Sequence, residues 1–186
     1  MNVLDAIRTR RSVRSYAPEK PIPPEVMQRM LQALRLAPSA CNIQPWHFIL
    51  AASDSLRQEL AQAANGQTWM AEAPVTIVGC GFPDQAYKRM GGYGNSVDVD
   101  LAIALDHLTL AAVAEGLGTC WIGAFDEAKV KALLGVPQQV KVVAMTPLGY
   151  PSSPELNHPA APEARKGEDA IFNLDRYGNP FSWQPA

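Results

Sequence analysis

Two arginines and a serine alternate near the start of the chain, within Arg10-Arg11-Ser12-Val13-Arg14. Alternate side chains of an extended segment point to the same side, so Arg10, Ser12 and Arg14 would offer two guanidinium groups and a hydroxyl to one anion. Guanidinium groups bind phosphate through paired hydrogen bonds. This spacing favours a phosphorylated cofactor over a nucleic acid, because no basic stripe or stacking aromatics extend it. Arginines at a helix end can equally be solvated or lie near the negative end of the helix dipole.

A second stretch whose side chains could bind a ligand covers residues 38–48, Pro38-Ser39-Ala40-Cys41-Asn42-Ile43-Gln44-Pro45-Trp46-His47-Phe48. It joins a helix end and small residues to amide side chains that both donate and accept hydrogen bonds. A planar heterocycle with mixed donors and acceptors needs this combination. A polar turn between a helix and a strand would explain Pro38 and Ser39, but not the pair Asn42 and Gln44 beside aromatic residues.

The usual signatures of other chemistries are incomplete. Gly79-Cys80-Gly81 begins like a dinucleotide fingerprint, but Asp84 stands where the third glycine belongs. Ser96 lacks the final glycine of a nucleophile elbow. No Walker A sequence and no H-E-x-x-H occurs, and three scattered histidines, His47, His107 and His158, have no metal-ligand spacing. We therefore expect no metal site.

The charge composition gives no support for two classes of binding partner, nucleic acids and anionic membranes. The chain has 186 residues, and its 16 basic against 18 acidic side chains provide no overall field for a nucleic acid or an anionic membrane. We expect one domain, large enough to fold without disulfides or metals. The widely spaced Cys41, Cys80 and Cys120 indicate a reducing compartment. With no signal-like start and no apolar stretch of about 18 residues, the sequence predicts a cytoplasmic protein.

The predicted elements place these motifs on connections between helices and strands. A helix, 98–115, is apolar on almost every side, so it is expected either at the centre of the molecule or between two subunits. Residues 81–97 are glycine-rich and irregular. The aromatic tail, residues 171–183 with Trp183 at its end, is expected to dock on another surface. The other predicted helices are 3–9, 25–36, 53–64 and 127–134, and the predicted strands are 47–51, 75–80 and 139–148, with 119–125 as a strand or extended loop.

Three motifs in this order resemble the flavin-dependent nitroreductase family. They are Arg10-Arg11-Ser12-Val13-Arg14-Ser15-Tyr16, residues 37–48, and Gly116-Leu117-Gly118-Thr119-Cys120-Trp121-Ile122-Gly123. The resemblance implies an α+β fold with a central, mostly antiparallel sheet flanked by helices. It also implies one FMN-binding domain, 1–186, in an intertwined homodimer with two interfacial flavins, whose C-terminal arm, 151–186, packs on the partner.

The resemblance assigns residues to a tightly bound FMN and none to catalysis. Arg10, Ser12 and Arg14, with Arg11 between them, match the phosphate and ribityl positions, and Arg165 with Lys166 closes on the same phosphate. Pro38, Ser39 and Ala40, with Asn42 close by, match the stretch that the partner supplies. Gln67 falls near the pyrimidine edge. The segment against the isoalloxazine ring comprises Trp121, Ile122, Gly123 and Ala124.

The implied reaction is a two-step cycle: NADH or NADPH delivers hydride to flavin N5 and leaves, and a nitroaromatic, quinone or similar small acceptor then takes the electrons. The alternatives are a flavin-binding redox sensor or carrier, or a relative that reduces enones, dehalogenates or destroys flavin. Two features differ from larger relatives, a glycine at Gly123 where they have glutamate and the short 81–97 region. Cys41 and Cys120 are interpreted as small residues that permit close packing.

Overall fold

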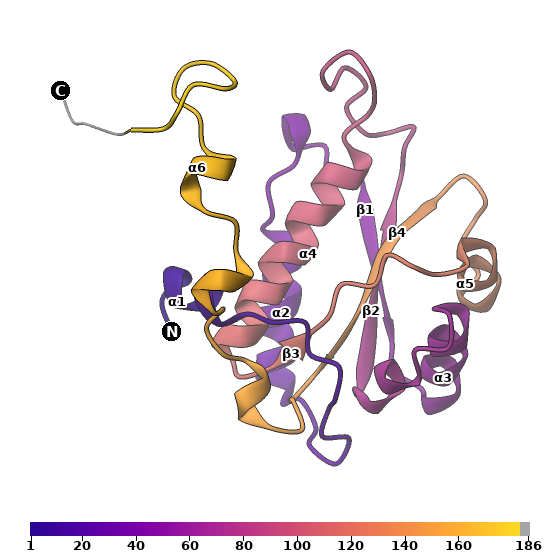
Figure 1. Ribbon diagram of the computed structural model, residues 1–186. Helices are drawn as coiled ribbons and strands as arrows, with labels where there is room; N and C mark the ends of the chain where they lie inside the picture. The colour runs from indigo at the N-terminus through magenta and orange to yellow at the C-terminus, as the bar shows by residue number, and fades with distance from the viewer. Residues whose placement is uncertain (183–186) are drawn as a thin grey trace.

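The computed structural model describes residues 1–182 and has the predicted α+β architecture (Figure 1). Six α-helices are present in this part of the chain: α1 Val3–Thr9, α2 Pro24–Arg35, α3 Asp54–Ala63, α4 Val97–Ala114, α5 Glu127–Leu134 and α6 Glu168–Ile171. The strands are β1 Trp46–Ala51, β2 Val75–Gly81, β3 Gly118–Thr119 and β4 Lys141–Gly149. Short 3-10 turns, among them η1 Ala40–Asn42 and η2 Thr68–Glu72, connect them.

The four strands form one antiparallel sheet in the order β1-β2-β4-β3. β2 lies inside the sheet and is buried along its whole length, as its run of branched residues predicts. Ile77 pairs with Leu50 of β1 and with Thr146 of β4. β1 is an edge strand, so one side of its backbone is free of partners in this sheet.

Helices cover both faces of the sheet, and successive residues of β2 point into different cores. Ile77 packs with α2 and α4, whereas Val78 packs with α3 and α5. α4 lies very close to the sheet at Gly79, where a Cβ atom would lie 3.1 Å from Leu101 Cδ2. The helix predicted to be central is therefore buried mainly within its own chain, between the sheet and α2.

Most predicted boundaries agree with the structure to within one or two residues. α5 begins and ends as predicted because Asp126 accepts the N–H of Lys129 at its N-terminus and Gly135 takes a left-handed conformation after its last residue. The segment predicted as 119–125 is a two-residue strand followed by a bridge between Ile122 and Met145.

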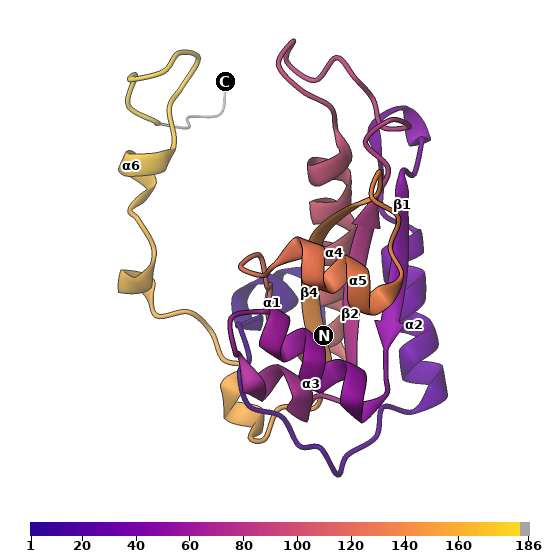
Figure 2. The same cartoon turned by 90° about the vertical axis from the view of Figure 1, so that its right-hand side faces the viewer.

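The C-terminal arm has two parts. Its beginning is fixed to its own chain, because Ser152 donates to the carbonyl of Ser15 (3.1 Å) and Asn157 donates to that of Leu117 (3.0 Å). Beyond Ala160 its backbone stands away from the body of the chain (Figure 2), although the side chain of Arg165 still lies near Arg11. Ile171, Phe172 and Tyr177 are exposed there. Trp183, which we expected to dock with them, lies outside the described residues.

Candidate functional site

The basic segment, residues 10–14, lies beside β3. Val13 N–H donates to the carbonyl of Thr119 (2.9 Å), and Ser12 and Thr119 form a parallel bridge. Gly118 permits this approach, because a Cβ at that position would lie 2.8 Å from Val13 Cβ. Val13 is buried, whereas Ser12 and Arg14 are exposed. The alternation expected of an extended segment is therefore present.

Positive charge in the basic segment has no acidic partner. Within residues 1–182, no carboxylate lies within ion-pairing distance of Arg10, Arg11, Arg14 or Arg165. Desolvation, followed by repulsion from Arg165 and Arg10, holds the pKa of Arg11 below its ordinary value. The Nη2 atom of Arg11 is shielded from water and has no partner in the described chain. A cluster of guanidinium groups with a free buried donor fits a phosphate dianion.

Arg165 reaches this cluster from the C-terminal arm, 151 residues beyond Arg14 in numbering. The arm follows residues 8–17 along part of its course, and Ala160 donates to the carbonyl of Arg8 (3.3 Å). Lys166 is exposed beside Arg165. The structure therefore places Arg165 near Arg11, where the two positive charges repel each other.

Cys120 lies under the basic segment. Burial raises the pKa of its thiol, and the nearby Arg14, Ser12 and Arg10 offset part of that effect. The thiol is buried, so it packs as a small apolar group at this position. This geometry agrees with the packing interpretation of Cys120.

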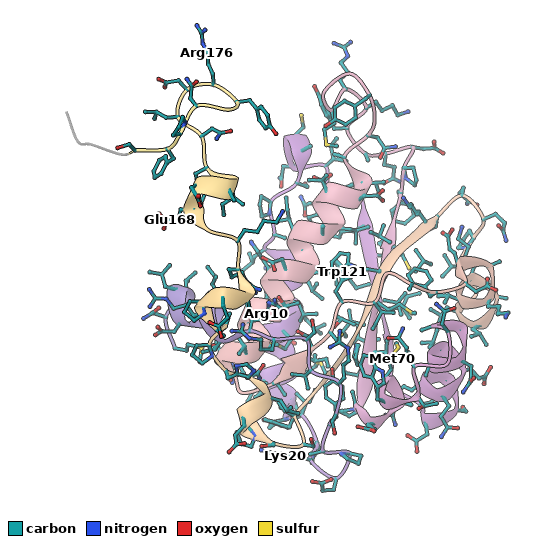
Figure 3. The ribbon with its side chains drawn as sticks, viewed as in Figure 1. Arg10, Lys20, Met70, Trp121, Glu168 and Arg176 are labelled. Atoms are coloured by element: carbon teal, nitrogen blue, oxygen red, sulfur yellow. The ribbon has the colours of Figure 1, made fainter. Side chains whose placement is uncertain are left out.

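The Trp121 segment, residues 121–124, continues from there. Ile122 is buried and exchanges two backbone hydrogen bonds with Met145, at 2.8 and 3.0 Å. Its N–H is therefore not available to a ligand. The N–H groups of Gly123 and Ala124 have no acceptor within residues 1–182. Trp121 is 45% exposed, and Figure 3 shows it beside the sheet.

The loop that holds Gln67 packs against the end of this segment. Asp126 N–H donates to the carbonyl of Ala63 (2.9 Å), and Asn65 Nδ2 lies 3.4 Å from the carbonyl oxygen of Ala124. Gln67 donates its amide to the carbonyl of Ala64 (2.9 Å), which leaves its oxygen free. The sequence motifs did not indicate Asn65 as part of this site. Its backbone is left-handed, with φ at 59°, a conformation that asparagine adopts more readily than most residues.

The amide loop, residues 38–44, has an uncommon backbone. Cys41, Asn42 and Gln44 have φ angles of 53°, 56° and 55°. A non-glycine residue held in this region costs on the order of 1 kcal/mol or more, and such residues concentrate at ligand sites. Ser39 Oγ accepts the N–H of Gln44 (2.9 Å), and the Gln44 amide donates to the carbonyl of Asn42 (3.0 Å). The loop is thus ordered internally, while Pro38 and Asn42 stay exposed.

Asp100 anchors this loop to α4 and was missed by sequence reasoning. Its carboxylate accepts the N–H of Ala40 (3.0 Å) and the hydroxyl of Ser96 (2.7 Å). The residue is 2% exposed. An aspartate on the apolar helix was the available signal, since buried carboxylates normally have dedicated partners.

The two groups of candidate residues lie toward opposite ends of α4. η1 lies at the N-terminal end of the helix in Figure 1, and Figure 3 shows Arg10 beside its C-terminal half. α4 has 18 residues, a length of about 27 Å. We call the basic segment, Gln67 and the Trp121 segment, which are linked through Thr119 and Asn65, one candidate half-site, and we call the amide loop the other.

No helix in the described residues is long and apolar enough to cross a bilayer. Residues 1–182 also contain no group of three histidine, cysteine or acidic side chains that could hold a metal ion.

Helices on both faces of one antiparallel sheet make this an α+β protein. The model of the nitroreductase family matches residues 7–74 and 63–150, and the chain belongs to this family. A protein of Archaeoglobus fulgidus, provisionally named NADH dehydrogenase/NAD(P)H nitroreductase, is 35% identical over 178 residues, covering 93% of this chain and 94% of its own. The resemblance of the three motifs and the expected fold class are confirmed.

Two further relatives bear on chemistry. The Bacillus subtilis FMN reductase [NAD(P)H] is 28% identical over 189 residues, which cover 93% of this chain and 76% of the relative. The solved structure of NADPH:FMN oxidoreductase from Vibrio harveyi, complexed with NAD+, superposes with a TM-score of 0.82 at 26% identity. That match covers 96% of this chain and 79% of the other.

Proposed function

We propose that this protein is an FMN-dependent oxidoreductase that takes hydride from NADH or NADPH and reduces a small acceptor such as a nitroaromatic or a quinone. Its family and its named relatives support the class, an NAD(P)H-dependent FMN oxidoreductase. The observation that carries the proposal is an arginine cluster without acidic partners that is bridged to Thr119, a few residues before the free N–H groups of Gly123 and Ala124. Phosphate at one end and a polar ring edge at the other are the features of FMN.

The chain's own residues would bind and orient the cofactor. Arg10, Ser12 and Arg14 would hold the phosphate and ribityl chain, with Arg11 and Arg165 adding charge and Lys166 beside them. Gly123 or Ala124 would direct a backbone N–H at the ring, because the N–H of Ile122 is already paired. Gln67 has a free amide oxygen for the pyrimidine edge. When bound, FMN supplies hydride transfer at N5, so no general acid or base from the chain is required.

We further propose that the complete site needs two chains. The amide loop is tied to the N-terminal end of α4, about 27 Å along the helix from the end near the basic segment. A second chain related by two-fold symmetry would bring its amide loop, with Pro38, Ser39, Ala40 and Asn42, to the flavin. The outer part of the C-terminal arm and the unpaired edge of β1 offer further surfaces for an intertwined homodimer. A chain that remains monomeric is the alternative.

The order of events that fits one shared binding face is ping-pong. The oxidised nicotinamide must leave before the acceptor enters, because both would lie against the same exposed surface beside Trp121. A cytoplasmic location remains a prediction from the sequence.

The deciding experiment begins with the visible spectrum of the purified protein. We expect a yellow protein that binds FMN and whose flavin absorbance bleaches on anaerobic titration with NADH or NADPH, then recovers when a quinone or nitroaromatic is added. A protein that takes up no FMN contradicts the proposal. Flavin that binds but bleaches only over hours identifies the sensor or carrier instead, while rapid bleaching without turnover of either acceptor indicates another reductive reaction.

A further inference from the structure

The glycine-rich region between β2 and α4 contains an ordered turn, residues 87–94, which we name the Tyr93 turn. Met90 N–H donates to the carbonyl of Gly94 (3.1 Å), and Tyr93 N–H donates to that of Met90 (3.2 Å). Ser96 N–H closes the base of the turn on the carbonyl of Tyr87 (2.9 Å). The sequence predicts an irregular region here, and the structure has neither a helix nor a strand between β2 and α4. The three hydrogen bonds nevertheless close residues 87–94 into a turn.

Tyr93 forms an aromatic platform on this turn. Its ring lies against Gly91, where a Cβ atom would collide with the ring. Gly91 also has a φ of 58°, so glycine at this position both permits the left-handed backbone of the turn and leaves room for the Tyr93 ring. The side chain of Tyr93 is 83% exposed, and Tyr87 at the base of the turn is exposed as well. A rigid exposed ring of this kind is suited to stacking on a planar base.

Two cations precede Tyr93 on the same turn. Lys88 and Arg89 are exposed, and neither forms an ion pair or donates a side-chain hydrogen bond to any group in residues 1–182. Asp84 lies on the same connection. Asp98, the next acid along the chain, is paired with Lys141 at 2.7 Å. The turn therefore has a net positive charge next to its aromatic ring.

The Tyr93 turn lies at the same end of the molecule as the amide loop. Both are seen near the N-terminal end of α4 in Figures 1 and 2. Phe82 N–H donates to the carbonyl of Pro45 (3.0 Å), and Asp100 connects Ser96 to Ala40. The base of the Tyr93 turn and the amide loop are therefore anchored to the same end of α4.

We propose that the Tyr93 turn binds the adenosine phosphate end of the reduced nicotinamide dinucleotide, with Tyr93 stacking on adenine and Lys88 and Arg89 pairing with phosphate. This inference rests on the proposed function and extends it, because it assigns a binding site for the reductant to residues outside the FMN half-sites. The nicotinamide ring would lie at the flavin while the opposite end of the same molecule reaches the turn.

The first test uses the flavin-loaded double variant Lys88→Ala/Arg89→Ala. We measure KM for NADPH and NADH, and in parallel the binding of 2′,5′-ADP and of ADP by calorimetry. We expect KM for at least one dinucleotide and the Kd of the corresponding probe to rise roughly tenfold, with kcat nearly unchanged. Lys129→Ala, which removes an exposed lysine on α5, is the charge control and should leave all four values unchanged.

The pattern of change identifies the phosphate that is recognised. A rise confined to NADPH and 2′,5′-ADP assigns the cations to the 2′-phosphate, whereas an equal rise for both dinucleotides and for ADP assigns them to the pyrophosphate. Unchanged constants for both overturn the proposal. In that case rapid flavin reduction by the unaltered protein would leave the proposed function intact, so the two failures are distinguishable.

A second test addresses the ring. Tyr93→Ala removes the stacking surface and should raise the same KM by about five- to tenfold, whereas Tyr93→Phe keeps the ring and should stay within twofold of the original protein. Equal effects of the two substitutions would contradict stacking. Thermal unfolding of each variant reports whether the turn substitutions disturb the fold itself.

Discussion

The buried carboxylate of Asp100 accepts the backbone N–H of Ala40 at 3.0 Å, which joins the first turn of α4 to a loop with three left-handed non-glycine residues. Ser96 donates to the same carboxylate at 2.7 Å. Because Cys41 directly follows Ala40 in a left-handed conformation, the hydrogen bond from Ala40 stabilises a backbone that cysteine does not favour on its own.

Replacing Asp100 by alanine should therefore affect both stability and FMN binding. The N–H of Ala40 and the hydroxyl of Ser96 would lose a charged partner in a buried setting, a loss of about 2 kcal/mol in the free energy of unfolding. Asp100→Asn keeps an oxygen for Ala40 and should recover most of that loss. Chemical denaturation measures the stability, and fluorescence titration measures the Kd of FMN. An alanine variant with the original FMN affinity would show that this loop does not contribute to FMN binding.

Arg10→Ala should empty the protein of FMN and leave its fold intact. The guanidinium group lies in a cluster with no carboxylate partner, so its removal relieves repulsion and cannot strand an acid. Loss of one charge-assisted contact to phosphate is worth roughly 1.5–3 kcal/mol, or about a 10- to 100-fold increase in the Kd of FMN. Arg10→Lys should retain part of the affinity, since a point charge replaces a bidentate group.

The measurement is the flavin content after purification, followed by titration of the apoprotein with FMN. Lys129→Ala changes the net charge equally at a distant site and serves as the control. Full flavin occupancy in Arg10→Ala, with unchanged affinity, would place the phosphate elsewhere.

Much of the fold was accessible from local sequence patterns. The β-branched run of β2 and the Asp126 cap of α5 depend on neighbours within a few residues, so these elements were predicted correctly. The alternation of Val13 with its exposed neighbours is also a local property. For the candidate site, the motifs indicated the basic segment and the amide loop as the places to examine.

The remaining features depend on contacts between distant parts of the chain. Local patterns near Arg11 do not indicate Arg165, which only the family resemblance assigned to the same phosphate, and nothing near Ala40 identifies Asp100 as its partner. The left-handed backbone at Cys41 and Gln44 opposes the preferences of these residue types, so it arises from the surrounding structure. The separation of the two half-sites follows from the length and direction of α4, which local patterns do not report.

Gly118→Ala should push the basic segment away from β3. The new Cβ would lie 2.8 Å from Val13 Cβ, closer than two carbon atoms approach in a packed core. Overpacking of this kind costs about 1–3 kcal/mol, and the displaced Ser12 and Arg14 should weaken FMN binding as well. Gly94→Ala is the matched control, because a Cβ there meets no atom within 4 Å. Thermal unfolding and FMN titration of both variants check this prediction. If both variants had the same thermal stability and the same affinity for FMN, the close contact between β3 and the basic segment would contribute to neither.

Acid should weaken the contact between α5 and β4. Burial raises the pKa of Glu127, but the N–H of Val142 at 2.9 Å and the ammonium of Lys131 at 3.1 Å outweigh it and hold the pKa below its usual value of 4.5. The folded state therefore binds the proton less readily than the unfolded chain. The stabilisation is fully present above about pH 5 and is lost as the pH falls through the lowered pKa. Since the carboxylate is partly solvated, we expect it to contribute no more than about 1 kcal/mol to the free energy of unfolding.

Urea unfolding of the original protein and of Glu127→Gln, followed from pH 7 to pH 3, measures this contribution. The difference in free energy of unfolding between the two proteins should shrink steadily below pH 5, and a difference independent of pH would show that the ionised carboxylate does not stabilise this contact.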